Sequence, residues 1–176
     1  MPYLWLIIGL FLQSCVSVPA AIEPVNGFNV NKYLGKWYEL ARLDHSFERG
    51  LERVTAEYSL LDDDGIKVIN RGYDPISGSW KEAEGKAYFV DDSTVGHLKV
   101  SFFGPFYGSY IIFSLGNDYE YALVTSYNKD YLWLLSRAPI IDAVRKNDLI
   151  SRLVELEFDT QALIYVNQQV NSIANQ

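Results

Sequence analysis

Residues able to do covalent or metal chemistry are scarce in this chain. It has a single cysteine, Cys15, and two histidines, His45 and His97, far apart in the sequence. Most acidic residues fall on expected outward strand positions, and neither Gly-x-Ser-x-Gly nor His-Glu-x-x-His occurs. An enzyme would need a feature such as a buried acid beside a histidine, and the sequence indicates none. We therefore expect a binding protein, not an enzyme, with no metal and no cofactor.

The cysteine is the one residue whose surroundings indicate a specific modification. It follows an unbroken apolar run, Tyr3–Leu12, which is too short to span a bilayer comfortably and is typical of a signal peptide. Leu12-Gln13-Ser14-Cys15 resembles the lipobox of bacterial lipoproteins, and this resemblance implies cleavage before Cys15 and acylation of its thiol. The alternative is an ordinary secretory signal beside an incidental cysteine.

The same resemblance predicts how the chain is divided and where it resides. Residues 1–14 are expected to be a lipoprotein signal peptide, 15–27 the lipidated cysteine and a tether, and 28–176 one folded domain. Val16 replaces the Asp that is associated with retention in the inner membrane. The expected location is the outer membrane of a Gram-negative bacterium, facing the periplasm.

Composition limits the classes of partner. A length of 176 residues fits one domain, and a formal net charge of -7 disfavours binding to nucleic acid. Aromatic residues make up 15% of the chain. Tyr and Trp combine a large apolar body with one polar group, which suits β-sheets and also suits an apolar cavity that is partly wet.

The elements expected to position any site are strands with short connections. Asp64-Gly65 favours a tight hairpin between two of them. The fold class is therefore all-β: an eight-stranded up-and-down antiparallel barrel, with an open sandwich as the alternative. A helix is expected over Asp142–Glu157, packed outside the barrel, with a short extra strand over Leu163–Val166. The eight strands are expected at residues 38–43, 54–60, 66–73, 80–90, 97–103, 109–115, 119–126 and 131–137.

Alternation along these strands assigns residues to the barrel interior. Small residues among them would leave space for a ligand, whereas larger ones would fill the barrel. The alternative is a packed core. The expected inward residues are Val54, Ala56, Tyr58, Val68, Asn70, Ala83, Ala87, Phe89, Leu98, Val100, Phe102, Tyr121, Leu123, Thr125, Trp133 and Leu135.

Three separated motifs resemble those of the lipocalin family. Gly35-Lys36-Trp37-Tyr38 matches the Gly-x-Trp-Tyr motif, Asn117-Asp118-Tyr119 looks like the Thr-Asp-Tyr motif, and Arg137 stands at the end of the eighth strand, where the family places an Arg. In physical terms, Trp37 would close one end of the barrel, with Arg137 on its face, and Gly35 would permit the preceding turn. These three residues are expected to define the fold and not a catalytic set.

Further segments resemble the bacterial branch of that family, which is similar to apolipoprotein D and the plant temperature-induced lipocalins. They are Asp44–Leu51, Phe102–Gly108 and Tyr131–Trp133. The resemblance implies a fatty acid or lysophospholipid ligand, for transport or storage in the cell envelope, and a homodimer is among the assemblies it implies. The rival function is an envelope scaffold or assembly lipoprotein with a filled barrel.

In lipocalins the loop between the first two strands covers the open mouth. Phe47 and Leu51 could therefore meet an acyl chain, while His45 and Arg49 could meet a head group or phosphate. The alternative is a charged, solvated loop, and for His45 this alternative is favoured. Tyr107 is expected at the mouth by resemblance to the bacterial branch. The complete set of expected ligand-binding residues is Tyr58, Asn70, Ala87, Phe102, Tyr107, Tyr121 and Trp133, with Cys15 as the lipid anchor.

Overall fold

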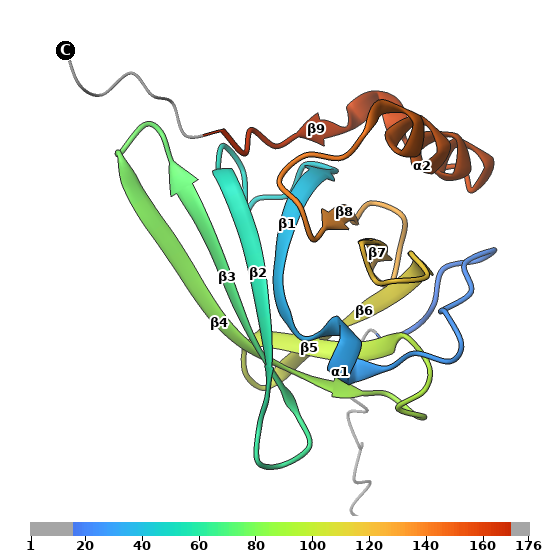
Figure 1. The fold of residues 1–176 in the computed structure, drawn as a ribbon. Coiled ribbons are helices and arrows are strands. Elements are labelled where there is room, and N and C mark those ends of the chain that lie inside the picture. Colours follow the sequence, from blue (N-terminus) through green and yellow to red (C-terminus); the bar gives the residue numbers. More distant parts are fainter. Residues whose placement is uncertain (1–15, 170–176) are drawn as a thin grey trace, which may run out of the picture.

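The computed structural model describes residues 16–169, so the predicted signal peptide and Cys15 lie outside the described residues. Eight antiparallel strands form a closed barrel, as predicted (Figure 1). Each strand pairs with the next along the chain, and β1 pairs with both β2 and β8. The strands are β1 Gly35–Arg42, β2 Glu52–Leu60, β3 Ile66–Asp74, β4 Ser79–Phe89, β5 His97–Phe103, β6 Phe106–Leu115, β7 Tyr121–Thr125 and β8 Leu132–Ser136.

On one side, β1 pairs with two different strands along its length. Residues Gly35–Tyr38 pair with β2, and Ala41 and Arg42 then pair with β9 (Ile164–Tyr165), the predicted extra strand. Where β1 and β2 part, the side-chain amide of Gln168 donates to the carbonyls of Glu39 (2.7 Å) and Val54 (2.9 Å). The C-terminal segment therefore supplies hydrogen bonds that the two strands no longer give each other.

The helix α2 (Ala143–Glu155) lies outside the barrel, as predicted (Figure 1). Asp142 caps it by accepting a bond of 2.9 Å from the backbone N–H of Arg145. Leu149 and Leu153 on its inner stripe are buried. They belong to an outer core, separate from the barrel interior, that also contains Ile111, Phe113, Leu123, Leu132, Leu134 and Phe158.

This outer core explains why the predicted orientation of β7 is wrong. Ala122 and Val124 face the barrel interior, whereas Tyr121 and Leu123 face α2, where the Arg145 guanidinium lies 5.3 Å from the Tyr121 ring. The expectation was based on Glu120 as an outward strand residue, but Glu120 lies in the turn before β7. Because both faces of β7 are buried, its own residues show no polar alternation that could correct the error.

The expected tether is packed against the barrel. Ile22 is buried, and Val25 donates its backbone N–H to the carbonyl of Ile112 (2.9 Å) and accepts one from Gly96 (2.9 Å). A short helix, α1 (Val30–Tyr33), then leads into β1. The few apolar residues of this segment therefore dock on the barrel wall, and residues 16–27 do not form a free spacer.

Candidate ligand-binding site

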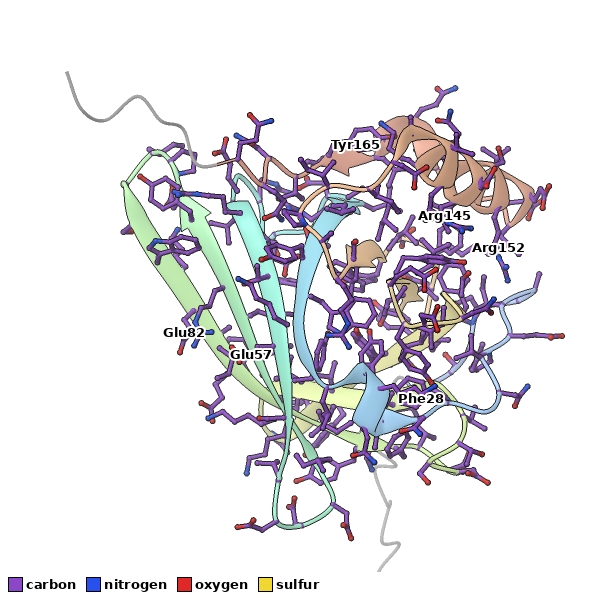
Figure 2. All side chains as sticks on the ribbon, viewed as in Figure 1. Phe28, Glu57, Glu82, Arg145, Arg152 and Tyr165 are labelled. Atoms are coloured by element: carbon purple, nitrogen blue, oxygen red, sulfur yellow. The ribbon has the colours of Figure 1, made fainter. Side chains whose placement is uncertain are left out.

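The barrel encloses a cavity of about 590 Å³. Ala56, Ala83 and Ala87 are among its lining residues and leave the space that a barrel filled by its own side chains would lack. Phe28, beside α1, lies at the closed end of the cavity, whereas Arg145 projects from α2 outside the barrel (Figure 2). Phe47, Phe103 and Phe106 also line the cavity and are 59%, 81% and 74% exposed, so they mark its open mouth.

Five of the seven predicted ligand residues line this cavity: Tyr58, Asn70, Ala87, Phe102 and Trp133. That they contact a ligand stays a prediction. Sequence reasoning missed Gly85, where an added Cβ would come within 2.8 Å of the Phe102 ring. Glycine at this position therefore gives the Phe102 ring its place inside the barrel.

The two remaining residues of that set lie elsewhere. The first is Tyr121, which faces α2, as described above. Thr125 on the same strand, outside that set but also expected to face inward, instead uses its hydroxyl to close the β7–β8 turn on the carbonyl of Tyr131 (2.7 Å). Tyr107 lies near Tyr88 (6.3 Å between ring centroids) and Lys99 (5.6 Å from the ring), away from the cavity lining. The β5–β6 pairing shifts register between Val100 and Phe103, so alternation does not carry through this hairpin.

The closed end is built as predicted. Trp37 is fully buried and donates its indole N–H to the carbonyl of Tyr33 at 2.8 Å. The Arg137 guanidinium lies 4.0 Å from the centroid of the Trp37 ring and donates to the carbonyls of Lys32 (2.7 Å) and Lys36 (2.9 Å). Gly35 has φ +88°, a left-handed conformation that favours glycine.

Three tyrosine hydroxyls form a polar network inside the barrel. The Tyr110 hydroxyl lies 2.8 Å from that of Tyr33 and 2.7 Å from that of Tyr58. Burial raises the pKa of all three phenols, so they are neutral. Because the hydroxyls satisfy one another, the rings can present apolar faces to the cavity. Tyr110, on β6, was not predicted because that strand carries no charged residue to fix its orientation.

The open end contains buried charge that sequence reasoning did not predict. Glu39 and Glu48 both line the cavity, yet they are only 3% and 7% exposed. Arg42 is 1% exposed and donates to Glu39 Oε1 at 2.7 Å and to the carbonyl of Glu48 at 2.7 Å. The signal that could have found Glu39 is its spacing of two from Trp37, which places both on the inner face of β1.

His45 lies against this group, so the expectation of no buried acid beside a histidine is wrong. Its Nε2 atom is 3.3 Å from Glu48 Oε2, and its ring stacks on Phe47 at 4.0 Å. Burial lowers the pKa of His45 to about 4, so the imidazole is neutral at pH 7. Neither ring nitrogen has a hydrogen-bond partner among the described residues. Arg49 lies apart, in an exposed ion pair with Asp44 at 2.7 Å.

The two carboxyls cannot both ionise easily. Burial and the nearby Glu48 carboxylate raise the pKa of Glu39 well above its ordinary range, although Arg42 opposes this shift. Burial also raises the pKa of Glu48, against the effects of the Trp133 N–H at 3.2 Å and of Arg42. With one guanidinium beside two buried carboxyls, and bonded to only one of them, the arrangement favours a proton held by the pair.

No group of three His, Cys, Asp or Glu residues within 16–169 is placed to hold a metal ion. In the same part of the chain, no helix has the length and apolar character needed to cross a membrane.

Comparison with known proteins agrees with this architecture. The model of the lipocalin-like domain matches residues 28–168. The outer membrane lipoprotein Blc of Vibrio cholerae is 57% identical over 92% of this chain and 95% of its own length. Blc of Escherichia coli is 51% identical over 85% of each chain, and rat apolipoprotein D is 36% identical over 74% of this chain and 69% of its own.

Among solved structures, insecticyanin from the tobacco hornworm Manduca sexta superposes with a TM-score of 0.68 at 20% identity, covering 86% of each chain, which shows the shared fold. The identity to the Blc lipoproteins places this chain at the outer membrane as a lipid-anchored protein. Lipocalins are carriers of small apolar ligands. The family model and these relatives together show that the chain belongs to the lipocalin family.

Proposed function

We propose that this lipocalin binds one single-chain lipid, a fatty acid or a lysophospholipid, inside the barrel and carries or stores it at the periplasmic side of the outer membrane. The observation that supports this is the cavity of about 590 Å³, lined largely by apolar residues and open beside three exposed phenylalanines. Burial of the acyl chain drives binding, at ~0.8 kcal/mol for each CH₂ removed from water. The function needs no cofactor and no catalysis.

The two rival functions fit the structure less well. A scaffold with a filled barrel is disfavoured by the cavity itself. An enzyme is favoured by a single feature, the contact between His45 and Glu48. However, the His45 ring does not line the cavity, and its pKa of about 4 makes it a weak base at pH 7, so it is poorly suited to exchange a proton with a bound lipid.

Filling the cavity should abolish lipid binding. We expect Ala87→Trp to lose most affinity for a sixteen-carbon fatty acid or lysophospholipid, at a cost of ~1–3 kcal/mol in stability from overpacking. Ala143→Trp, at an exposed position on α2, is the matched control and should bind like the parent. Native mass spectrometry and titration of the intrinsic fluorescence measure binding, with circular dichroism to verify folding. Full binding by folded Ala87→Trp would place the lipid outside the barrel.

We further propose that Cys15 carries the anchor. The Ser109 hydroxyl donates to the carbonyl of Ser17 at 3.0 Å, so the chain is fixed to the barrel wall two residues after the cysteine. Acyl chains on Cys15 would therefore hold the barrel close to the membrane surface. Cys15→Ser should move the protein from the membrane fraction to the soluble fraction or leave it unprocessed. A cleaved mutant that stays entirely in membranes would contradict acylation.

A further inference from the structure

The cavity mouth carries two acids that face the lipid site. Glu39 lies in the middle of β1, and Glu48 belongs to the loop that joins β1 to β2. We call them the mouth carboxyl pair. Both line the cavity, and the Trp133 indole, which also lines it, donates to Glu48 Oε2 at 3.2 Å. A group at the open end of a bound lipid would therefore lie against carboxyl oxygens and the Trp133 ring.

The buried positive charge beside the pair is not free to meet a ligand. Arg42 directs one nitrogen to Glu39 and the other to the carbonyls of Glu48 (2.7 Å) and Leu51 (3.4 Å). It is 1% exposed and does not line the cavity. An anionic head group entering the mouth would thus meet the carboxyls, with the guanidinium hidden behind them.

Other cations near the cavity already have acidic partners. Arg71 pairs with Glu57 (3.0 Å) and Glu82 (2.7 Å), and Lys81 pairs with Asp74 (2.8 Å). Two titratable groups near the mouth carboxyl pair are neutral: the His45 imidazole, whose nitrogens make no hydrogen bond among the described residues, and the Tyr58 phenol. Two carboxyls and one guanidinium leave one negative charge, which a proton or a cation must balance.

We propose that the mouth carboxyl pair, Glu39 and Glu48, is the subsite for the ammonium end of a single-chain zwitterionic lipid. This rests on the proposed function, since the lipid must enter the barrel. An ammonium N–H would donate to the carboxylates, and the aromatic faces of Trp133 and Phe47 suit the same cation. The acyl chain then runs inward past Ala56 toward the three tyrosines, all of which line the cavity or border it.

The subsite separates lipids by head group. An ammonium replaces the proton that balances the pair, so the charge stays compensated when the site is dry. A fatty-acid carboxylate supplies no positive charge and must be held beside the pair in its protonated form or remain in water. We therefore expect an ammonium lipid to bind at least tenfold more tightly than an anionic one with the same chain.

The first test uses the acylated protein in detergent-free nanodiscs and three probes with one sixteen-carbon chain: lysophosphatidylethanolamine, lysophosphatidylglycerol and the free fatty acid. Calorimetry at pH 7, in two buffers of different ionisation heat, measures affinity and proton release together. The ethanolamine lipid should bind most tightly and release up to one proton from the pair. The glycerol lipid should release none.

The second test uses charge-neutral variants. Glu48→Gln keeps an acceptor for the Trp133 indole and should reduce the preference for the ethanolamine lipid about tenfold, without loss of affinity for the glycerol lipid. Glu39→Gln should change the preference in the same direction. It takes the place of Glu48→Gln in this test if the Glu48 variant fails to fold. Glu57→Gln, an exposed acid that does not line the cavity, is the matched control and should leave the preference unchanged.

The outcomes separate the two proposals. If no lipid binds, the proposed function fails and this inference fails with it. If the three probes bind equally, or if the glycerol lipid binds best, the function stands and the ammonium subsite is wrong. If Glu57→Gln alters the preference as much as Glu48→Gln, the selectivity comes from net charge and the subsite is likewise overturned.

Discussion

The two ends of the barrel are built on opposite principles. At the closed end, Trp37 and Arg137 donate to backbone carbonyls and stack on each other. The indole N–H and the guanidinium therefore have hydrogen-bond partners within the packed structure. At the open end, Arg42 Nε and both nitrogens of His45 are buried without a hydrogen-bond partner among the described residues. Unsatisfied buried groups cost stability. The comparison indicates that the closed end is built for stability, whereas the open end keeps buried polar groups at a cost in stability.

The largest expected effect comes from the closed end. Trp37→Ala removes a fully buried ring and should lower the free energy of unfolding by ~3–5 kcal/mol. Urea denaturation followed by circular dichroism measures the loss. In conditions where the variant is still folded, its order of preference among lipid head groups should be that of the parent. A variant with parental stability and altered preference would reverse the roles of the two ends.

Replacing each arginine by methionine compares the ends directly. Arg42→Met leaves the mouth carboxyl pair without its buried cation and should cost ~3–5 kcal/mol. This cost should grow as pH rises, because ionised Glu39 then lacks a partner. Arg137→Met removes a stacking contact of ~0.5–2 kcal/mol, together with partly exposed hydrogen bonds, and its cost should vary little between pH 6 and 8. Denaturation at both pH values measures both changes, and equal pH dependence would refute the contrast.

The closed end could be predicted from the sequence because its residues act locally and belong to recognisable motifs. Gly35, Trp37 and Arg137 occupy the expected places. At the mouth, Phe47, Leu51 and Trp133 line the cavity as expected. Its charged part could not be predicted, because Arg42 and Glu48 come together from β1 and a loop, and charged residues are expected to be exposed. The wrong orientation of β7 has the same physical origin: α2 buries its outer face, which removes the polar signal that alternation needs.

The smallest expected effect concerns His45 and acid. Burial holds its pKa at about 4 in the folded protein, against about 6.5 for an unperturbed histidine. The unfolded chain therefore binds more protons between these values, and the His45 contribution to stability is lost as pH falls from 6.5 through 4. The raised pKa values of Glu39 and Glu48 act in the opposite direction, since their contribution is lost as pH rises.

His45→Phe separates these contributions. Phenylalanine can stack on Phe47 and binds no proton. Both proteins keep Glu39 and Glu48, so the difference between variant and parent reports mainly the protonation of the imidazole and its contact with Glu48. At pH 7 the two proteins should be similarly stable, and by pH 5.5 the variant should gain roughly 1–2 kcal/mol over the parent, since one pKa unit corresponds to about 1.4 kcal/mol. Urea denaturation at half-unit steps of pH measures the difference. A difference that is flat with pH would show that the imidazole is not held neutral at the mouth.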